Sequence, residues 1–405
     1  MKNSPSKFGK GIGLLWRGMS LKIVSQFLLH TAKHRRMGGI VGDDNTNTLL
    51  FESSRSALFN CLMSQNIGEG DEVIISSFTC DAVTYAVMRT GATVVYSDIN
   101  DDLTMQTESV LRAITENTKV IVMQNTLGRV GLDVSTISLI KKKNILLIED
   151  CALSYGSVFD GIKLGTYGDF SFFSLEVSKT LTIGWGGVLS INNFRYKTDM
   201  LKRYASVGSV SLIPDTRRFL QLYLSLFLIK MKPLGGVWLW YFLYGFRIFR
   251  RSNSYDLNAN CKSEKMGNLS QSFYKYVHTQ FDEFYRITNR NYLSFSNAAH
   301  KLGLKQAIVE KPNEFIVSPR FSLMVKPKNV QHAVDLGEAM NIEVGRWFGD
   351  APPSWKVKNA RIESSVNASR ISDSIINLPC HWTLSENEIL EIKQFMFELS
   401  LIESK

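Results

Sequence analysis

Strand-like and helical patterns alternate between about Leu49 and Asn193, and this alternation limits the available folds more than any other feature of the chain. Short apolar runs predict strands, and helical patterns lie between them. The strands are expected at Glu72–Ile75, Thr93–Tyr96, Lys119–Met123 and Ile145–Ile148, and helices at Ala82–Met88 and Ser109–Ile114. Continuous apolar strands separated by helices are typical of a mostly parallel sheet with helices on both faces. We therefore expect an α/β large domain of three layers.

The rest of the chain predicts additional units, because 405 residues are enough for two or three domains. A long helical pattern near 270–302, a strand-like FSLMV and two later helices, near 330–340 and 385–401, indicate a smaller α+β domain. The expected division is a basic N-terminal arm at 1–45, the large domain at 46–210, a basic apolar helical insertion at 211–262, and a linking helix with the small C-terminal domain at 263–405.

Polar residues follow several of the predicted strands. In open parallel sheets, ligands bind beyond the carboxyl ends of the strands. The residues at these positions are Ser76 to Cys80, Gln124 with Asn125, and Glu149 with Asp150. They are the first candidates for a binding site.

Lys179 follows Asp150 by 29 residues and lies close to an aromatic-rich turn. A partly desolvated lysine can form a Schiff base, and a carboxylate at a strand end can keep a pyridine nitrogen protonated. By themselves, the residues favour ordinary roles. Lysine is usually a solvated surface charge, and Asp at a strand end often caps a helix.

A series of motifs in order adds a more specific indication. Residues 53–193 resemble the DegT/DnrJ/EryC1/StrS family of sugar aminotransferases, which depend on pyridoxal 5′-phosphate (PLP) and have the type I aspartate-aminotransferase fold. The matching stretches are SSRSAL (53–58), NIGEGDEVIISSFT (66–79), GATVVYSDIN (91–100), QNTLGRVGLDV (124–134), LLIEDCALSYG (146–156), GTYGDFSFFSLEVSKTL (165–181), GWGG (184–187) and NLPCHWTLSENEI (377–389). These stretches are spread from residue 53 to residue 389.

The resemblance implies roles for individual residues. Lys179 would form the Schiff base with the cofactor and then carry the proton, and Asp150 would pair with the pyridine nitrogen. Ser174 would bind the phosphate. Arg55 and Ser56 would bind it too, at the positive end of a helix. Asn125 would hydrogen-bond the ring oxygen. Catalysis would thus depend on Lys179 and Asp150.

Several positions depart from the family pattern. Cys80 stands where an aromatic residue often stacks on the cofactor, Leu153 replaces a common glutamine, and Trp185 replaces the glutamate of GEGG. The family's G-x-N-x-R segment, which reaches the neighbouring subunit's phosphate, is not clear in this sequence, and Asn268 in MGNLSQ is a candidate for its asparagine. Because a related dehydrating branch has His at the lysine position, Lys179 argues against dehydration.

The net charge of +10 is concentrated in two segments that are also apolar. Residues 1–39 carry eight basic residues and residues 217–251 carry seven, and neither segment contains an acid. Removing these fifteen from the 47 basic residues leaves 32 against 37 acidic ones. Since neither segment has an apolar run long enough to span a bilayer, helices lying at a membrane surface are one interpretation. Core or dimer-interface helices with solvated basic ends are the other.

Other site classes receive no support. Six scattered histidines and five widely spaced cysteines predict no metal site, and a nucleic-acid surface would not contain so many aliphatic residues. The few cysteines and the lack of a convincing signal peptide indicate a cytoplasmic protein. A membrane contact of this protein would be with the inner face of the membrane.

The resemblance predicts a PLP-dependent homodimer that transfers an amino group from glutamate to a keto-sugar, nucleotide-linked, for surface polysaccharide or O-antigen synthesis. One alternative is an inactive, membrane-associated paralogue that acts as a binding or scaffold protein. Another keeps the cofactor and uses a lipid-linked sugar acceptor.

Overall fold

The computed structural model describes residues 20–34, 47–231, 235–246, 263–353 and 360–404. Its centre is an eight-stranded sheet with the order β1-β9-β8-β5-β4-β2-β3-β13. The strands are β1 (Thr48–Phe51), β2 (Glu72–Ser76), β3 (Thr93–Ser97), β4 (Thr118–Gln124), β5 (Leu146–Asp150), β8 (Phe170–Ser174), β9 (Gly187–Ile191) and β13 (Ala360–Ile362). Only β9 runs against the others, so the sheet is mostly parallel, as the sequence predicted.

The two faces of this sheet bury different side chains of the same strands, because successive residues of a strand point to opposite sides. On β4, Val120 and Val122 belong to the core beneath α3 (Ser54–Ser64), α4 (Asp81–Met88) and α7 (Lys197–Ser206). Ile121 and Met123 belong to the core beneath α5 (Thr107–Ala113) and α6 (Val134–Lys142). Continuous apolar strands therefore produce the three layers, which confirms the predicted fold class.

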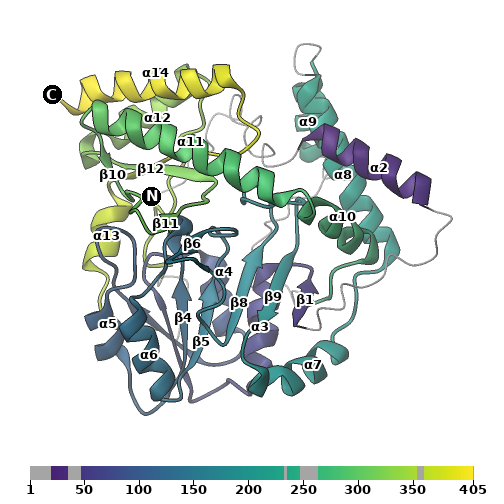
Figure 1. Ribbon diagram of the computed structural model, residues 1–405, viewed down its shortest axis with the longest axis vertical. Helices are drawn as coiled ribbons and strands as arrows, with labels where there is room; N and C mark the ends of the chain where they lie inside the picture. The colour runs from purple at the N-terminus through teal and green to yellow at the C-terminus, as the bar shows by residue number, and fades with distance from the viewer. Residues whose placement is uncertain (1–19, 35–46, 232–234, 247–262, 354–359, 405) are drawn as a thin grey trace.

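The small domain covers one end of this sheet (Figure 1). Strands β10 (Lys305–Gln306), β12 (Arg320–Met324) and β14 (Ile375–Pro379) form an antiparallel sheet. They pack with helices α11 (Phe281–Lys301), α12 (Val330–Ala339), α13 (Val366–Ser372) and α14 (Glu386–Glu403) around a second core. Helix α14 begins with a capping box between Ser385 and Glu388. A third short sheet joins β11 (Glu314–Phe315) to β6 (Val158–Phe159) and β7 (Ile162–Lys163).

The long helix expected near 270–302 is two helices, α10 (Asn268–His278) and α11. The charges on either side of the break fit this division. Lys275 and His278 lie in the last turn of α10, and Asp282 and Glu283 in the first turn of α11. Each pair complements the dipole at its helix end. The C-terminal part of the chain also returns to the large sheet, where β13 pairs in parallel with β3.

Three apolar helices stand together at one side of the molecule (Figure 1). They are α2 (Leu21–His34), α8 (Leu212–Lys230) and α9 (Gly236–Gly245). Phe27 of α2, Phe219 of α8 and Phe273 of α10 form one aromatic cluster, with ring centroids 5.0 to 5.6 Å apart. One face of α2 and one face of α8 therefore belong to the hydrophobic core. The basic residues at 1–19, 35–36 and 247–251, on which the predicted membrane-surface helices depend, lie outside the described residues.

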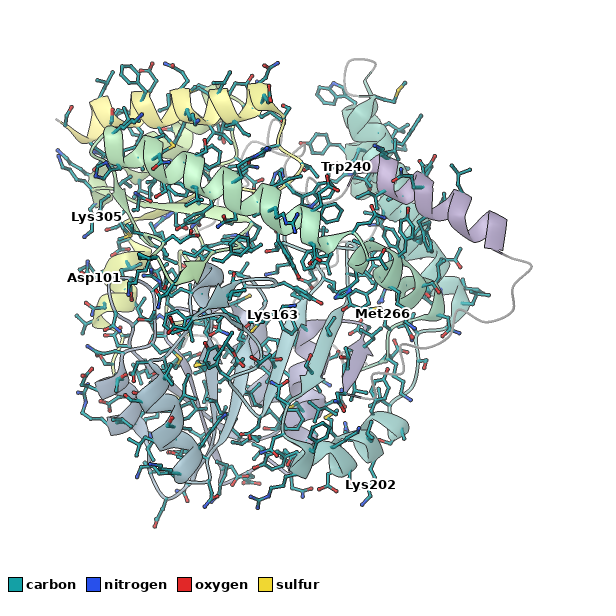
Figure 2. The ribbon with its side chains drawn as sticks, viewed as in Figure 1. Asp101, Lys163, Lys202, Trp240, Met266 and Lys305 are labelled. Atoms are coloured by element: carbon teal, nitrogen blue, oxygen red, sulfur yellow. The ribbon has the colours of Figure 1, made fainter. Side chains whose placement is uncertain are left out.

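The same helices expose large apolar side chains elsewhere. Trp238 is 80% exposed and Phe246 is 68% exposed, whereas Trp240 on α9 is buried and points into the packed side chains (Figure 2). Among the described residues, none of the helices combines the length and the apolar character needed to cross a bilayer.

Replacing Phe219 by Ala is expected to lower the free energy of unfolding by about 3–5 kcal/mol, because it opens a cavity in the aromatic cluster. Phe242→Ala is the matched control, since Phe242 is 53% exposed on the neighbouring helix, and its effect should stay within about 0.5 kcal/mol. Urea unfolding followed by circular dichroism measures both. Equal losses of unfolding free energy in the two variants would contradict the packing of α8 against the rest of the protein.

Candidate active site

A cavity of about 600 Å³, part of it open to solvent, lies beyond the carboxyl ends of β4, β5 and β8. It is the position at which a parallel sheet binds ligands. The N-terminus of α3, the start of α4, the loop after β8 and one residue of the small domain complete its wall. The lining residues are Ser54, Arg55, Leu58, Cys80, Ala82, Val83, Gln124, Asn125, Thr126, Asp150, Ala152, Leu153, Phe172, Ser174, Glu176, Lys179 and Phe348.

Asp150 is the last residue of β5 and is buried. Its Oδ1 accepts a hydrogen bond of 2.9 Å from the backbone N–H of Ala152. Burial raises the pKa of Asp150 to about 6, and the Ala152 N–H and the positive charge of Lys179 oppose this rise. The carboxylate thus lies where a partner with an N–H group or a positive charge would lower its pKa.

Lys179 reaches the same cavity from the loop between β8 and β9. The preceding residue, Ser178, has a φ of 67°, which turns the chain sharply before the lysine. The Nζ of Lys179 lies 4.9 Å from the ring centroid of Trp347, a residue of the small domain. The aromatic face holds the ammonium group by a cation–π contact. The structure therefore brings Lys179 and Asp150 together, as predicted.

A positively charged end of the cavity forms around α3. Ser53 caps this helix, and its Oγ accepts a 3.2 Å hydrogen bond from the N–H of Ser56. Ser54 and Arg55, in the first turn, face the cavity together with Ser174 at the end of β8. A helix N-terminus with an adjacent arginine is suited to an anion such as a phosphate.

Glu176, which the sequence reasoning missed, lies at the same end of the cavity. Burial raises the pKa of Glu176, and the positive charges of Lys179 and Arg55 oppose this rise. Only its position two residues after Ser174 could have pointed to it. A carboxylate thus stands among the groups that would hold a phosphate.

The prediction that Ser56 faces the ligand is not met. Ser56 is buried and is absent from the cavity lining. Its Oγ donates to Glu52 Oε1 at 3.0 Å, and its N–H is used by the Ser53 cap. Both polar groups of Ser56 therefore support the start of α3.

The amide of Asn125 is directed below the cavity and does not serve as predicted. Its Nδ2 donates to Glu149 Oε2 at 2.8 Å and to Cys151 Sγ at 3.2 Å, and its Oδ1 accepts from the N–H of Gly131 at 2.9 Å. The buried carboxylate of Glu149 needs donors, which explains this orientation. Asn125 borders the cavity without an available donor hydrogen.

Asn268 is exposed at the start of α10 and is not part of the cavity lining. Asp215 holds this helix start, accepting from the N–H of Leu269 at 2.9 Å. Because its expected contact is with the phosphate of a neighbouring subunit, the contact of Asn268 stays a prediction.

Two of the three departures from the family pattern do line the cavity. Cys80 precedes α4, and burial raises the pKa of its thiol, so it is not a thiolate nucleophile at neutral pH. Leu153 is buried beside Ala152. Trp185 lies away from the cavity lining, and its Nε1 donates to Ser270 Oγ at 2.8 Å. The change at Trp185 thus concerns the attachment of α10.

The small domain closes the cavity with two aromatic residues that the sequence reasoning did not find. Phe348 lines the cavity and packs edge-on against Phe78, with ring centroids 5.2 Å apart. Trp347 lies over Lys179. Trp347 and Phe348 lie some 170 residues after the lysine in the sequence, so their contact with the site could not be predicted from local motifs. Within the described residues, no cluster of metal-binding side chains accompanies the site.

The sequence profile of the DegT/DnrJ/EryC1/StrS aminotransferase family matches residues 42–228, which include Lys179 and Asp150. This part of the chain is therefore similar in sequence to that family.

Curated relatives match the same region. GDP-perosamine synthase of Escherichia coli O157:H7 is 37% identical over 138 residues, which are 34% of this chain and 38% of the relative. UDP-N-acetyl-3-dehydro-alpha-D-glucosamine 3-aminotransferase of Acidithiobacillus ferrooxidans is 36% identical over 139 residues, with the same shares. The chain thus matches less than half of the length of these relatives.

Solved structures extend the likeness of the fold to nearly the whole chain. The aminotransferase TlmJ from Streptoalloteichus hindustanus aligns with a TM-score of 0.70 over 96% of this chain and 92% of its own, at 17% identity. Spr1654 from Streptococcus pneumoniae in its PMP form aligns with a TM-score of 0.72 over 94% and 96%, at 18% identity, and its PLP form also matches. At this identity the likeness establishes the fold.

Asp150→Asn is expected to stabilise the cofactor-free protein above pH 6. Because burial raises the pKa of Asp150 from 3.8 to about 6, the folded protein binds more protons than the unfolded chain between these values, and its stability falls as the pH rises through that window. At 1.36 kcal/mol per unit, the variant gains about 3 kcal/mol at pH 8 and almost nothing at pH 4. Urea unfolding at both pH values checks this, with the exposed Asp373→Asn as control. A gain that is the same at pH 4 and pH 8 would contradict the prediction.

Proposed function

We propose that the protein is a PLP-dependent aminotransferase that transfers an amino group from glutamate to a nucleotide-linked keto-sugar. The observation that carries this proposal is the meeting of Lys179 and Asp150 in one cavity whose other end carries Arg55, Ser174 and the N-terminus of α3. These groups match the aldehyde, the ring nitrogen and the phosphate of pyridoxal phosphate. The family match supports the proposal.

The residues of the cavity suit the cofactor by their charge and position. When bound, pyridoxal phosphate supplies an electron sink for breaking a bond at the amino-bearing carbon of the substrate. Asp150 would hold the ring nitrogen protonated, and a positive partner would lower the pKa of the Asp150 carboxyl below about 6. Arg55, Ser174 and the α3 N–H groups would hold the phosphate.

Lys179 has two tasks in this proposal. Its amine would hold the cofactor, and once free it would move a proton on the substrate as a general base and acid. Trp347 keeps the amine near the cavity by its aromatic face. Phe348 and Phe78 form an apolar cover that limits the access of water to it.

The acceptor is proposed from the relatives, whose names refer to GDP- and UDP-linked sugars. An open cavity at the boundary of the two domains provides room for a bulky sugar next to Lys179. We propose that the product feeds surface polysaccharide synthesis and that the protein acts as a cytoplasmic homodimer, the oligomer expected of the type I fold.

The alternative is an inactive, membrane-associated paralogue that acts as a binding or scaffold protein. Glu176 favours it, because a carboxylate beside Arg55 opposes a phosphate at that position. Retention of Lys179, Asp150 and Ser174 in one cavity favours the enzyme. The presence or absence of a Schiff base decides between them.

We further propose that the tip formed by α8 and α9 rests on an anionic membrane surface. Trp238, Leu239, Phe242 and Phe246 are all at least half exposed there. The sequence from 217 to 251 has seven basic residues and no acid, so its charge complements acidic lipid headgroups. An acceptor sugar carried by a lipid would then be presented near the protein.

Lys179→Ala is expected to abolish the near-visible absorption band that the wild-type protein gains with added pyridoxal phosphate. The band reports the Schiff base, and borohydride should remove it from the wild type. Lys163→Ala is the matched control, because Lys163 is exposed on β7. Glutamate should convert the wild-type spectrum to that of the pyridoxamine form. A wild type without any band overturns the enzyme proposal in favour of the scaffold.

Wild-type protein is expected to sediment with vesicles containing phosphatidylglycerol and much less with pure phosphatidylcholine. High salt should weaken the association, because it screens the basic charges. Trp238→Ser combined with Phe242→Ser should reduce it at least tenfold. Phe194→Ser is the control, since Phe194 is 65% exposed elsewhere on the surface. If the wild type does not bind vesicles, the membrane contact is excluded. The exposed apolar side chains of the tip would then be explained by an interface with another protein.

A further inference from the structure

Two carboxylates, those of Asp150 and Glu176, are found among the described residues that line the large cavity. The positive charge of Lys179 acts on both of them, whereas that of Arg55 acts on Glu176. Glu176 therefore belongs to the end of the cavity that Arg55 and Ser174 form. This is the end at which the proposed function requires a phosphate to bind.

The backbone holds Glu176 in the wall of this cavity. It forms a parallel bridge with Gly184, and its N–H donates to Ser174 Oγ at 3.4 Å. Its carbonyl accepts from the N–H of Lys179 at 3.3 Å. Glu176 thus connects the serine proposed for the phosphate with the lysine proposed for the aldehyde. The residue cannot leave the wall without moving both of them.

The side chain of Glu176 receives no hydrogen bond from the described residues, and burial raises its pKa. The neighbouring Glu52 differs in this respect. Its Oε1 accepts from Ser53 Oγ at 3.3 Å and Ser56 Oγ at 3.0 Å, and its Oε2 lies 3.3 Å from Arg218 Nη2. A carboxylate needs donors, whereas a neutral carboxylic acid supplies one of its own. Glu176 is therefore the acid of this region that takes up a proton more readily.

The charges that face Glu176 determine how a phosphate can bind beside it. Arg55 and Lys179 are positive, Glu52 is negative, and burial keeps the thiol of Cys80 neutral. The N-terminus of α3 adds about half a positive charge. A phosphate ester carries nearly two negative charges above pH 7. These already exceed the charge of Arg55 and the helix end, and an ionised Glu176 would add one more.

Other charged residues near Lys179 belong to a different space. Arg320 and Glu343 line an adjoining smaller cavity of about 280 Å³, including space open to solvent, which shares Lys179 with the large cavity. Neither Glu176 nor Arg55 borders this smaller cavity. The charge balance around a phosphate therefore depends on the groups that face Glu176, and Glu176 can improve this balance by taking up a proton.

We propose that Glu176 binds the cofactor phosphate as a neutral carboxylic acid whose O–H donates a hydrogen bond to the phosphate. The inference rests on the proposed aminotransferase function and adds a ligand to its phosphate site. In the free protein Glu176 is ionised at pH 8, and it takes a proton from solvent when the phosphate binds. Since the complex then holds one more proton than its free components, the affinity falls as the pH rises. The carboxylate that opposes a phosphate thereby becomes a donor to it.

The test is calorimetric titration of the full-length, cofactor-free protein with benzyl phosphate. This compound has an aromatic ring and a phosphate ester but neither the aldehyde nor the ring nitrogen of the cofactor, so Lys179 and Asp150 have no group to attach or to pair with. Titrations at pH 8 in two buffers of different ionisation enthalpy give the number of protons taken up. The wild type should take up about one proton per molecule bound, and its affinity should fall by up to about tenfold between pH 7 and pH 8.

Glu176→Gln has nearly the same shape and donates from its amide without a proton from solvent. It should take up almost no proton and should bind benzyl phosphate about tenfold or more tightly than the wild type at pH 8, with a smaller difference at pH 6. Glu116→Gln is the matched control, because Glu116 is exposed before β4, at the opposite edge of the sheet, and it should behave as the wild type.

The outcomes separate this inference from the proposed function. Binding by the wild type without proton uptake overturns the inference, even if Glu176→Gln fails to fold. Weaker binding by Glu176→Gln at pH 8 contradicts it as well, and so does a wild type that does not bind benzyl phosphate at pH 7. A wild type that forms the Schiff-base band but takes up no proton leaves the aminotransferase intact. One that takes up the proton but forms no band with pyridoxal phosphate disproves the proposed function and retains Glu176 as a ligand of a phosphate site.

Discussion

The arrangement of the site depends on one buried carboxylate, that of Glu149. It is fully buried in β5 and accepts hydrogen bonds from Asn125 Nδ2 and from the backbone N–H groups of Gly165 and Gly168, at 2.7 to 2.9 Å. These bonds tie the end of β4 and the crossing before β8 to β5. Because successive strand residues point to opposite faces, fixing Glu149 on one side directs Asp150 into the cavity. The asparagine that the sequence assigned to the ligand is thus part of the support for the aspartate.

The sequence predicted the sheet well, because its strands are buried on both faces and read as continuous apolar runs. The predicted limits of the four strands differ from β2, β3, β4 and β5 by only one or two residues. Lys179 and Asp150 were found through motif order. The orientations of Ser56 and Asn125 were not predictable, because they follow from competition for nearby acceptors, Glu52 and Glu149. Trp347, Phe348 and Arg320 were missed because only tertiary packing brings them to Lys179.

The charge distribution around the cavity separates its two ends. Arg55 and the N-terminus of α3 make one end positive, and Glu176 moderates that charge. Arg320 lies in the wall of the adjoining smaller cavity, where its Nη2 is 3.5 Å from Glu343 Oε1. Lys179 borders both cavities and contributes to the electrostatics of Asp150, Cys80 and Glu176. One lysine therefore stands between the groups suited to a phosphate and the smaller cavity.

The pairing of β13 with β3 has a consequence for how the protein is made. Residues 360–362 complete the edge of a sheet whose other strands end by residue 191. During synthesis the β3 edge remains unpaired until almost the entire chain has left the ribosome. Open strand edges recruit other chains, so nascent protein is most exposed to aggregation in this interval. Truncations that remove the C-terminal third would keep that edge open permanently and should yield insoluble protein even though Asp150, Lys179 and the N-terminus of α3 are still present.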